Sequence, residues 1–283
     1  GQEKLTDEIS DSLDKAETLA EIEDIYRPFK PKRKTRASVA KEKGLEPLAV
    51  LISLQNSKEP LEKEAEKYVS EEKGVKNVQE AIDGAKDILA ENISDEADYR
   101  KRIRDLTFKK GTLVSAAKDE KAESVYEMYY DFTEAVSKVA GHRVLALNRG
   151  EKEKFLSVKI EAPEEEILRY LEKKVIRRDN PYTTPVLKEV VADSYQRLIA
   201  PAIERELRNE LTEKAEDGAI LVFGKNLEQL LMQPPIVGQV VLGWDPAFRT
   251  GCKLAVVDPT GKVIGTTVIY PTAPTTPKKI QAA

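Results

Sequence analysis

The residues of this chain that could take part in chemistry are concentrated in one basic segment. Residues 27–43 hold eight lysines and arginines and one acidic residue, Glu42. Cations spaced this closely can neutralise nucleic-acid phosphates without reading the base sequence. The candidate phosphate contacts are Arg27, Lys30, Lys32, Arg33, Lys34 and Arg36. The alternative is a solvated loop that pairs with the preceding acidic segment, since residues 1–24 hold nine acids and two lysines.

Two carboxylates lie where predicted strands end. Asp245 follows the apolar run 237–244, and Asp258 stands in Asp-Pro-Thr-Gly, where a role as turn former accounts for it. Cleavage of a phosphodiester by two metal ions needs several carboxylates that converge on ions about 3.5–4 Å apart. A lone strand-end aspartate does not meet this need. We therefore expect no catalytic residue, no metal site and no cofactor.

Other reactive or basic side chains carry weaker signals. The single cysteine, Cys252, and the single histidine, His142, exclude an intrachain disulfide, a cysteine-cluster metal site and two-histidine zinc motifs. We interpret His142 as structural. A second basic cluster on a predicted helix is interpreted as a solvated face: Arg100, Lys101, Arg102 and Arg104. Three tyrosines at helical spacing are interpreted as core residues rather than base-stacking platforms: Tyr126, Tyr129 and Tyr130.

Composition sets the class of protein. The 283 residues are 40% hydrophobic and 34% charged, with a net charge of −4, which favours a helix-rich protein of two or three units over a globally basic nucleic-acid binder. No stretch approaches the 18 apolar residues of a membrane span, and the N-terminus lacks the features of a secretory signal. The expected location is the cytoplasm.

The spacing of apolar residues predicts a mainly helical chain. Helices are expected over residues 5–26, 38–43, 47–55, 61–72, 77–92, 94–110 and 226–232, with further helical faces in 119–148 and a break at Gly141. A strand is expected at 155–160, a helix after Pro163, and the longest helical stretch at 186–214, kinked by Pro201. Pro28 and Pro31 are expected to hold the basic segment Arg27–Arg36 extended. Gly44, between two short helices, indicates a helix-turn-helix-like corner.

The C-terminal residues have a different pattern. Strands are expected at 237–244, 252–257 and 263–270, the last two joined as a hairpin through the turn 258–261. The proline-rich tail from Pro271 is expected to be the least ordered segment. We further expect one edge of the strand 237–244 to be open, so that residues 237–283 pair with a second molecule or pack on the helical units.

Four stretches together carry a family resemblance: residues 23–36, 43–49 (Lys-Gly-Leu-Glu-Pro-Leu-Ala), 142–151 (His-Arg-Val-Leu-Ala-Leu-Asn-Arg-Gly-Glu) and 243–253 (Gly-Trp-Asp-Pro-Ala-Phe-Arg-Thr-Gly-Cys-Lys). With them the chain resembles the Tex proteins, bacterial transcription accessory factors related to a eukaryotic elongation factor. The resemblance implies that residues 237–283 open an RNase H-like domain of the YqgF type. It also implies that the chain is a fragment, because Tex proteins continue through helix-hairpin-helix elements and an OB-type RNA-binding domain.

The resemblance bears on Asp245 as well. In RNase H-like nucleases an aspartate at this place is a metal ligand, but those relatives commonly have glycine where this chain has Ala247. Tex proteins are generally regarded as having a degenerate nuclease site. The further acidic ligands of that fold come from later elements, which lie beyond residue 283.

The resulting hypothesis has three regions: a helical N-terminal region with the basic segment (1–111), a central helical region (112–236), and the first three strands of an RNase H-like α/β domain (237–283). The expected function is that of a non-enzymatic scaffold of a Tex-like transcription factor. Its expected partners are nucleic acid, bound weakly, and RNA polymerase or an elongation complex, with no membrane partner. The alternative is a metal-dependent RNase H-like nuclease or junction resolvase.

Overall fold

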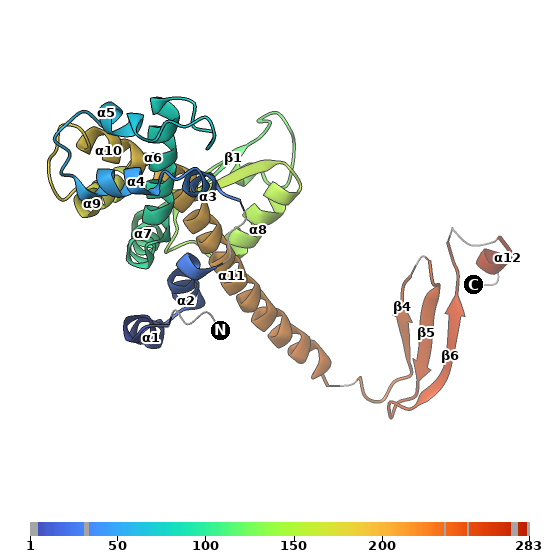
Figure 1. Ribbon diagram of the computed structural model, residues 1–283. Helices are drawn as coiled ribbons and strands as arrows, with labels where there is room; N and C mark the ends of the chain where they lie inside the picture. Colours follow the sequence, from blue (N-terminus) through green and yellow to red (C-terminus); the bar gives the residue numbers. More distant parts are fainter. Residues whose placement is uncertain (1–4, 31–33, 235, 248, 273–276, 282–283) are drawn as a thin grey trace. The chain divides into compact units, whose positions relative to one another are not determined.

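Helices make up most of the chain, as the sequence predicted (Figure 1). The computed structural model describes residues 5–30, 34–234, 236–247, 249–272 and 277–281. The chain divides into two units, Gly1–Ala219 and Ile220–Ala283. None of the described helices combines the length and apolar character needed to span a lipid bilayer.

The predicted helix over residues 5–26 is two helices, α1 (Asp7–Asp14) and α2 (Leu19–Tyr26). The break falls before Thr18, whose side-chain oxygen accepts a hydrogen bond from the backbone N–H of Glu21 and so caps α2. A threonine in this position favours a new helix start over continuation of the previous helix. The prediction of one helix was wrong because apolar spacing alone does not register such a cap.

The basic segment departs from the predicted extended form at both of its ends. The 3₁₀ turn η1 (Arg27–Phe29) directly follows α2, and α3 (Arg36–Glu42) begins at the last of the candidate contacts. Pro28 ends α2 as predicted, but Arg36 is helical rather than extended. Thr35 and Ser38 explain this start, since each side chain bonds the other's backbone N–H in a capping box.

The next helices follow the predicted order. They are α4 (Glu46–Leu54), α5 (Leu61–Glu66), α6 (Val78–Asp95) and α7 (Ala97–Lys110). Gly44, with φ of 79°, makes the turn between α3 and α4 that the sequence indicated. Asn77 caps α6 by accepting a hydrogen bond from Glu80 N–H, which confirms the predicted start.

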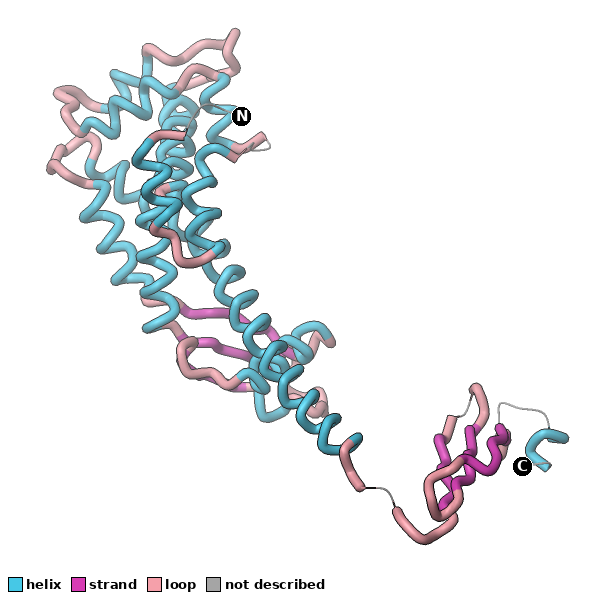
Figure 2. Tube along the Cα trace, turned by 90° about the horizontal axis from the view of Figure 1, so that it is seen from below, coloured by secondary structure: helices cyan, strands magenta, loops and turns pink. Residues whose placement is uncertain are grey.

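A three-stranded antiparallel sheet interrupts the region predicted as central and helical. Its strands are β1 (Thr112–Ala117), β2 (Asp131–Ala135) and β3 (Leu156–Glu161), in the order β2-β1-β3. The strand at β3 was predicted, whereas β1 was missed and the helical interpretation of residues 131–135 was wrong. Tyr126, which precedes the short turn η2 (Glu127–Tyr129), and Tyr129, which ends it, are buried as predicted. Figure 2 shows these strands as a group flanked by helices.

Helices resume after the sheet connections. Gly141 begins α8 (Gly141–Lys152) instead of breaking a helix. A Cβ at Gly141 would lie 3.2 Å from Ala215, so the absence of a side chain allows a later helix to approach closely. After β3 come α9 (Glu164–Val175) and α10 (Thr184–Asp193), then the π-helical turn η3 (Ser194–Ile199) and α11 (Ala200–Leu231). Pro201, which lacks a backbone N–H, is the second residue of α11 and follows the π-turn by two positions. The separate helix predicted at 226–232 is the end of α11.

One hydrophobic core holds the first unit together. Its buried members run from Ala37 to Leu207, so it crosses residue 111 and joins helices and sheet. The helix α6 contributes most to it, with Ala81, Ala85 and Ile88 at 1% exposure or less. Within the described part of the chain, α1 and α2 supply no member of this core. Other forces must therefore attach these two helices.

The second unit contains the three predicted C-terminal strands. They are β4 (Val241–Asp245), β5 (Cys252–Val257) and β6 (Val263–Ile269), antiparallel in the order β4-β5-β6. The turn at 258–261 closes the hairpin as predicted, with Gly261 N–H bonded to Asp258 O at 2.9 Å. Of the tail predicted to be least ordered, residues 273–276 and 282–283 lie outside the described residues, and α12 (Pro277–Gln281) is helical.

The strand β4 has an open edge. It pairs only with β5 among the described strands, and Leu242 and Trp244 are each 54% exposed. We expect the chain to self-associate through this edge, because free backbone donors and acceptors beside apolar side chains template strand pairing. In a light-scattering concentration series, the apparent mass of the full chain should rise while a chain ending at Gln233 stays monomeric. If both chains are monomeric and the amides of residues 237–270 still exchange slowly in the full chain, self-association through this edge is excluded.

Candidate nucleic-acid interface

Two of the six candidate contacts in the basic segment face acidic partners. Arg27 is partly buried, and its guanidinium lies 4.0 Å from the carboxylate of Glu206 on α11. Burial, together with the nearby charge of Arg100, lowers the pKa of Arg27. Lys30 donates a hydrogen bond to Glu23 of α2 at 3.3 Å. This is the pairing with the preceding acidic segment that the solvated-loop alternative described.

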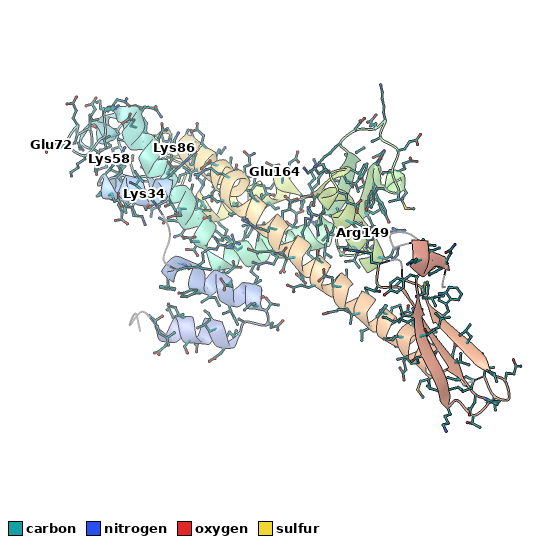
Figure 3. The ribbon with its side chains drawn as sticks, turned by 90° about the vertical axis from the view of Figure 1, so that its right-hand side faces the viewer. Lys34, Lys58, Glu72, Lys86, Arg149 and Glu164 are labelled. Atoms are coloured by element: carbon teal, nitrogen blue, oxygen red, sulfur yellow. The ribbon has the colours of Figure 1, made fainter. Side chains whose placement is uncertain are left out.

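Two other contacts face solvent. Lys34 and Arg36 are exposed, and neither forms an ion pair with another residue that the structure describes. Lys34 is labelled in Figure 3. The positive charge of Arg36 helps to lower the pKa of Asp193, although the hydrogen bond from Arg197 has the larger effect. Lys32 and Arg33 lie outside the described residues.

The segment between Arg27 and Arg36 has anchors at both ends. At its start, Arg27 and α2 are tied to α7 and α11 by ion pairs. At its end, the Thr35–Ser38 capping box begins α3, and Ala37 and Ala40 of that helix are buried in the core. Lys34 therefore lies next to a fixed helix start, which limits the entropy lost when its side chain binds a phosphate.

A buried charge network lies next to this span. Arg100 of α7 is fully buried and donates to Asp24 of α2, and also to Glu206 at 2.6 Å. Arg104, one turn further along α7, donates to the same two carboxylates at 2.6 and 2.7 Å. Burial lowers the pKa of Arg104, but these hydrogen bonds outweigh it and leave the pKa raised. The network joins three helices that are distant in sequence.

The prediction that residues 100–104 form a solvated face was therefore wrong for Arg100 and Arg104. It is confirmed for Lys101 and Arg102, which are exposed, Lys101 pairing with Glu21 at 2.8 Å. Two arginines one turn apart on a helix have the spacing of a solvent-exposed basic face, so the sequence does not indicate that they are buried in ion pairs. Here the partner carboxylates are 76 and 106 residues away from Arg100 in sequence, so no local signal pointed to them.

The stretch 142–151 contributes a second charged contact. Glu151 and Asn148 of α8 accept hydrogen bonds from Arg208 of α11, at 2.6 and 3.0 Å. Burial raises the pKa of Glu151, but the bonds from Arg208 outweigh it and leave the pKa lowered. His142 is exposed, and no contact in the described structure gives it a chemical role. These residues fasten α8 to α11 rather than form a reactive centre.

The two strand-end carboxylates are far apart. Asp245 pairs in register with Lys253, which lies five residues before Asp258. At about 3.4 Å per residue, the backbones of Asp245 and Asp258 are therefore separated by about 17 Å along the strand direction. Asp245 is exposed, and its nearest cation is Lys253 at 3.8 Å. Asp258 accepts hydrogen bonds from Thr260 and Lys262, which lower its pKa and confirm its role as turn former. Over the described residues, no three metal-ligating side chains gather.

Comparisons with known proteins agree with the resemblance. The Tex central region-like family matches residues 55–223, and the Tex protein YqgF-like domain matches residues 239–283, which assigns β4–β6 to the start of such a domain. The protein YdcI of Bacillus subtilis is 55% identical over 96% of this chain and 38% of its own length. Protein tex of Bordetella pertussis is 37% identical over 96% of this chain and 36% of its own length.

A human relative is more distant. The S1 RNA-binding domain-containing protein 1 of Homo sapiens is 32% identical over 89% of this chain and 27% of its own length. The chain thus spans between 27% and 38% of the length of these three relatives.

Proposed function

The chain belongs to the Tex family, and from that premise we propose that it is a nucleic-acid-binding, non-enzymatic part of a transcription accessory factor. One relative is named transcriptional accessory protein Tex and another is named for an S1 RNA-binding domain, which supports nucleic acid as the partner class. RNA polymerase or an elongation complex is the proposed protein partner, and the cytoplasm the proposed location.

The observation that carries this proposal is the anchored basic span with Lys34 and Arg36 exposed on it. Contacts of this kind bind phosphates without reading bases, so the dissociation constant should be on the order of 10⁻⁴–10⁻⁶ M at physiological salt. Because Arg27 and Lys30 already have acidic partners, the exposed residues and their neighbours Lys32 and Arg33 should contribute most.

The test reverses the charges of Lys32, Lys34, Arg33 and Arg36 by replacing each with glutamate. Binding of a labelled 20-nucleotide single-stranded RNA should be lost, because these residues supply the phosphate contacts. The matched control places glutamate at four lysines elsewhere, Lys58, Lys63, Lys76 and Lys109, which changes net charge equally. Fluorescence anisotropy across a salt series measures both. An equal loss in the control, or an unchanged salt slope in the first variant, would show that the span is only a solvated loop.

The non-enzymatic part of the proposal rests on the isolation of Asp245. Its distance from Asp258 leaves one carboxylate where two-metal cleavage needs several. We expect no magnesium- or manganese-dependent cleavage of single strands, duplexes or junctions by this chain. The gel assay includes Asp245→Asn as its control. Cleavage by the wild-type chain that disappears in Asp245→Asn would favour the alternative, a metal-dependent nuclease or junction resolvase.

A further inference from the structure

The N-terminal helix α2 is joined to α7 by ion pairs, and α1 contacts α2 (Figure 1). Asp24 is the one described residue of α1 and α2 that is buried, and α2 leaves large apolar side chains exposed, including Leu19 and Ile22. Three carboxylate contacts hold α2 to α7: Asp24 with Arg100, Asp24 with Arg104, and Glu21 with Lys101. An element held in this way separates more easily than one that shares the apolar core.

The surface beneath α2 is basic. Arg100, Lys101 and Arg104 occupy one face of α7, with Glu206 of α11 as the carboxylate that would stay with them if α2 moved away. One guanidinium nitrogen of Arg100, Nη1, is buried without a hydrogen-bond acceptor in the described structure. Guanidinium groups one helical turn apart match the bidentate, charge-assisted contacts that phosphate oxygens accept.

We propose that Arg100 and Arg104 form a second phosphate-binding site for a nucleic-acid backbone, which α2 masks with Asp24. This inference rests on the proposed function, because its ligand is the same nucleic acid. The carboxylate of Asp24 contacts both arginines at once, as a phosphate would. The segment that carries it is strongly acidic, with nine acids and two lysines over residues 1–24, so it competes with a polyanion for the same face.

Removal of α2 also affects the first basic span. Arg27 and Lys30 lie directly after α2 and are held by Glu206 and by Glu23 of α2 itself. When α2 leaves α7, the basic span loses one of its two anchors and gains reach. Burying the charges of Asp24, Arg100 and Arg104 costs free energy of desolvation. When α2 leaves, these charges return to water, and their hydration offsets part of the free energy lost with the ion pairs. Nucleic acid would therefore bind cooperatively with α2 release.

The primary test replaces Asp24 with asparagine, which keeps its shape and removes its charge. Unmasking two arginines should tighten binding of a 20-nucleotide oligouridylate about tenfold at 50 mM salt and steepen the log–log salt slope by about 1.4. The control is Asp14→Asn in α1, an equal charge change at an exposed residue without an ion pair to any other described residue. An equal gain in the control would overturn the inference, because net charge alone would explain it.

A second variant set guards against a folding effect of Asp24→Asn. In the triple variant Asp24→Asn/Glu21→Cys/Lys101→Cys, a short bis-maleimide cross-linker with an internal disulfide should join α2 to α7, because the long side chains of Glu21 and Lys101 now bridge this gap. Cross-linking should abolish the gain in affinity, and cleavage of the linker by reduction should restore it. In the triple variant Asp24→Asn/Arg100→Gln/Arg104→Gln, the gain should be absent. Equal binding by the cross-linked chain and by the chain with the linker cleaved would overturn the masked site.

The two proposals fail in different ways. If the fourfold glutamate variant of the basic span binds RNA as well as wild type does, the proposed function of that span is wrong. If that variant loses binding but Asp24→Asn and Asp14→Asn bind alike, the span binds RNA and the masked site does not exist. Faster amide exchange over residues 19–26 of the wild-type chain on addition of RNA would support release of α2 directly.

Discussion

Replacing Gly111 with alanine should lower the free energy of unfolding by about 2–4 kcal/mol, through backbone crowding and weakened hydrogen bonds. Gly111 joins α7 to β1 with φ of −74°, a conformation that any residue adopts, so glycine is needed there for space alone. A Cβ would lie 2.4 Å from the carbonyl oxygen of Thr107 and 3.1 Å from that of Glu161. These are backbone atoms of α7 and β3, which cannot move without shifting the elements themselves.

The control for this prediction is Gly218→Ala in α11. A Cβ at Gly218 has nothing within 4 Å. Alanine should therefore gain up to about 1 kcal/mol from its higher helix propensity. Urea unfolding followed by far-UV circular dichroism measures both variants, and a stable Gly111→Ala would show that α7 and β3 can separate without cost.

Replacing Gln55 with alanine should cost a similar free energy of unfolding, about 2–4 kcal/mol, because several buried hydrogen bonds are lost. The side chain of Gln55 donates to Val175 O at 2.8 Å and accepts from the backbone N–H groups of Arg177 and Arg178 at 2.9 Å. It thus joins the end of α4 to the segment after α9. The backbone of Gln55 has φ of 54°. Glutamine and alanine both carry a Cβ, so this conformation strains the two residues alike and the expected cost comes from the hydrogen bonds.

Gln79→Ala provides the control for Gln55→Ala. The amide of Gln79 is exposed and bonds only to Asp83, one turn along α6. Its loss should change the free energy of unfolding by less than about 0.5 kcal/mol. Thermal and urea unfolding of both variants give their free energies of unfolding. The difference between them separates the loss of the buried hydrogen bonds of Gln55 from any general effect of replacing a glutamine. Equal stabilities would contradict the role assigned to Gln55.

Features determined by neighbouring residues were predictable from the sequence. Asn77 at the start of α6, Gly44 between α3 and α4, and the turn at 258–261 all use side chains or glycine within a few residues of the feature. The strands β1 and β2 were not predictable in this way. β1 pairs with β2 on one side and with β3 on the other, and β3 lies more than twenty positions beyond β2. Neither β1 nor β2 has an alternation strong enough to indicate a strand alone.

The candidate interface was predictable in position but not in arrangement. The sequence located the basic segment, because eight cations within residues 27–43 need no partner to be recognised. It did not show that Arg27 faces Glu206, nor that Arg100 is buried against Asp24, because these contacts join helices far apart in the chain. Arginine occurs both buried in an ion pair, at Arg100, and exposed to solvent, at Arg36. Only the tertiary packing determines which of the two environments an arginine has.

The open strand β4 also carries the chain's one tryptophan, Trp244. Tryptophan emission therefore reports on the second unit alone, whereas the far-ultraviolet signal of the helices arises mostly from the first. A single sample can thus give separate unfolding curves for the two units without any label. Because the indole is 54% exposed, its emission should lie at long wavelength in the isolated chain and shift to shorter wavelength when another strand or protein covers β4.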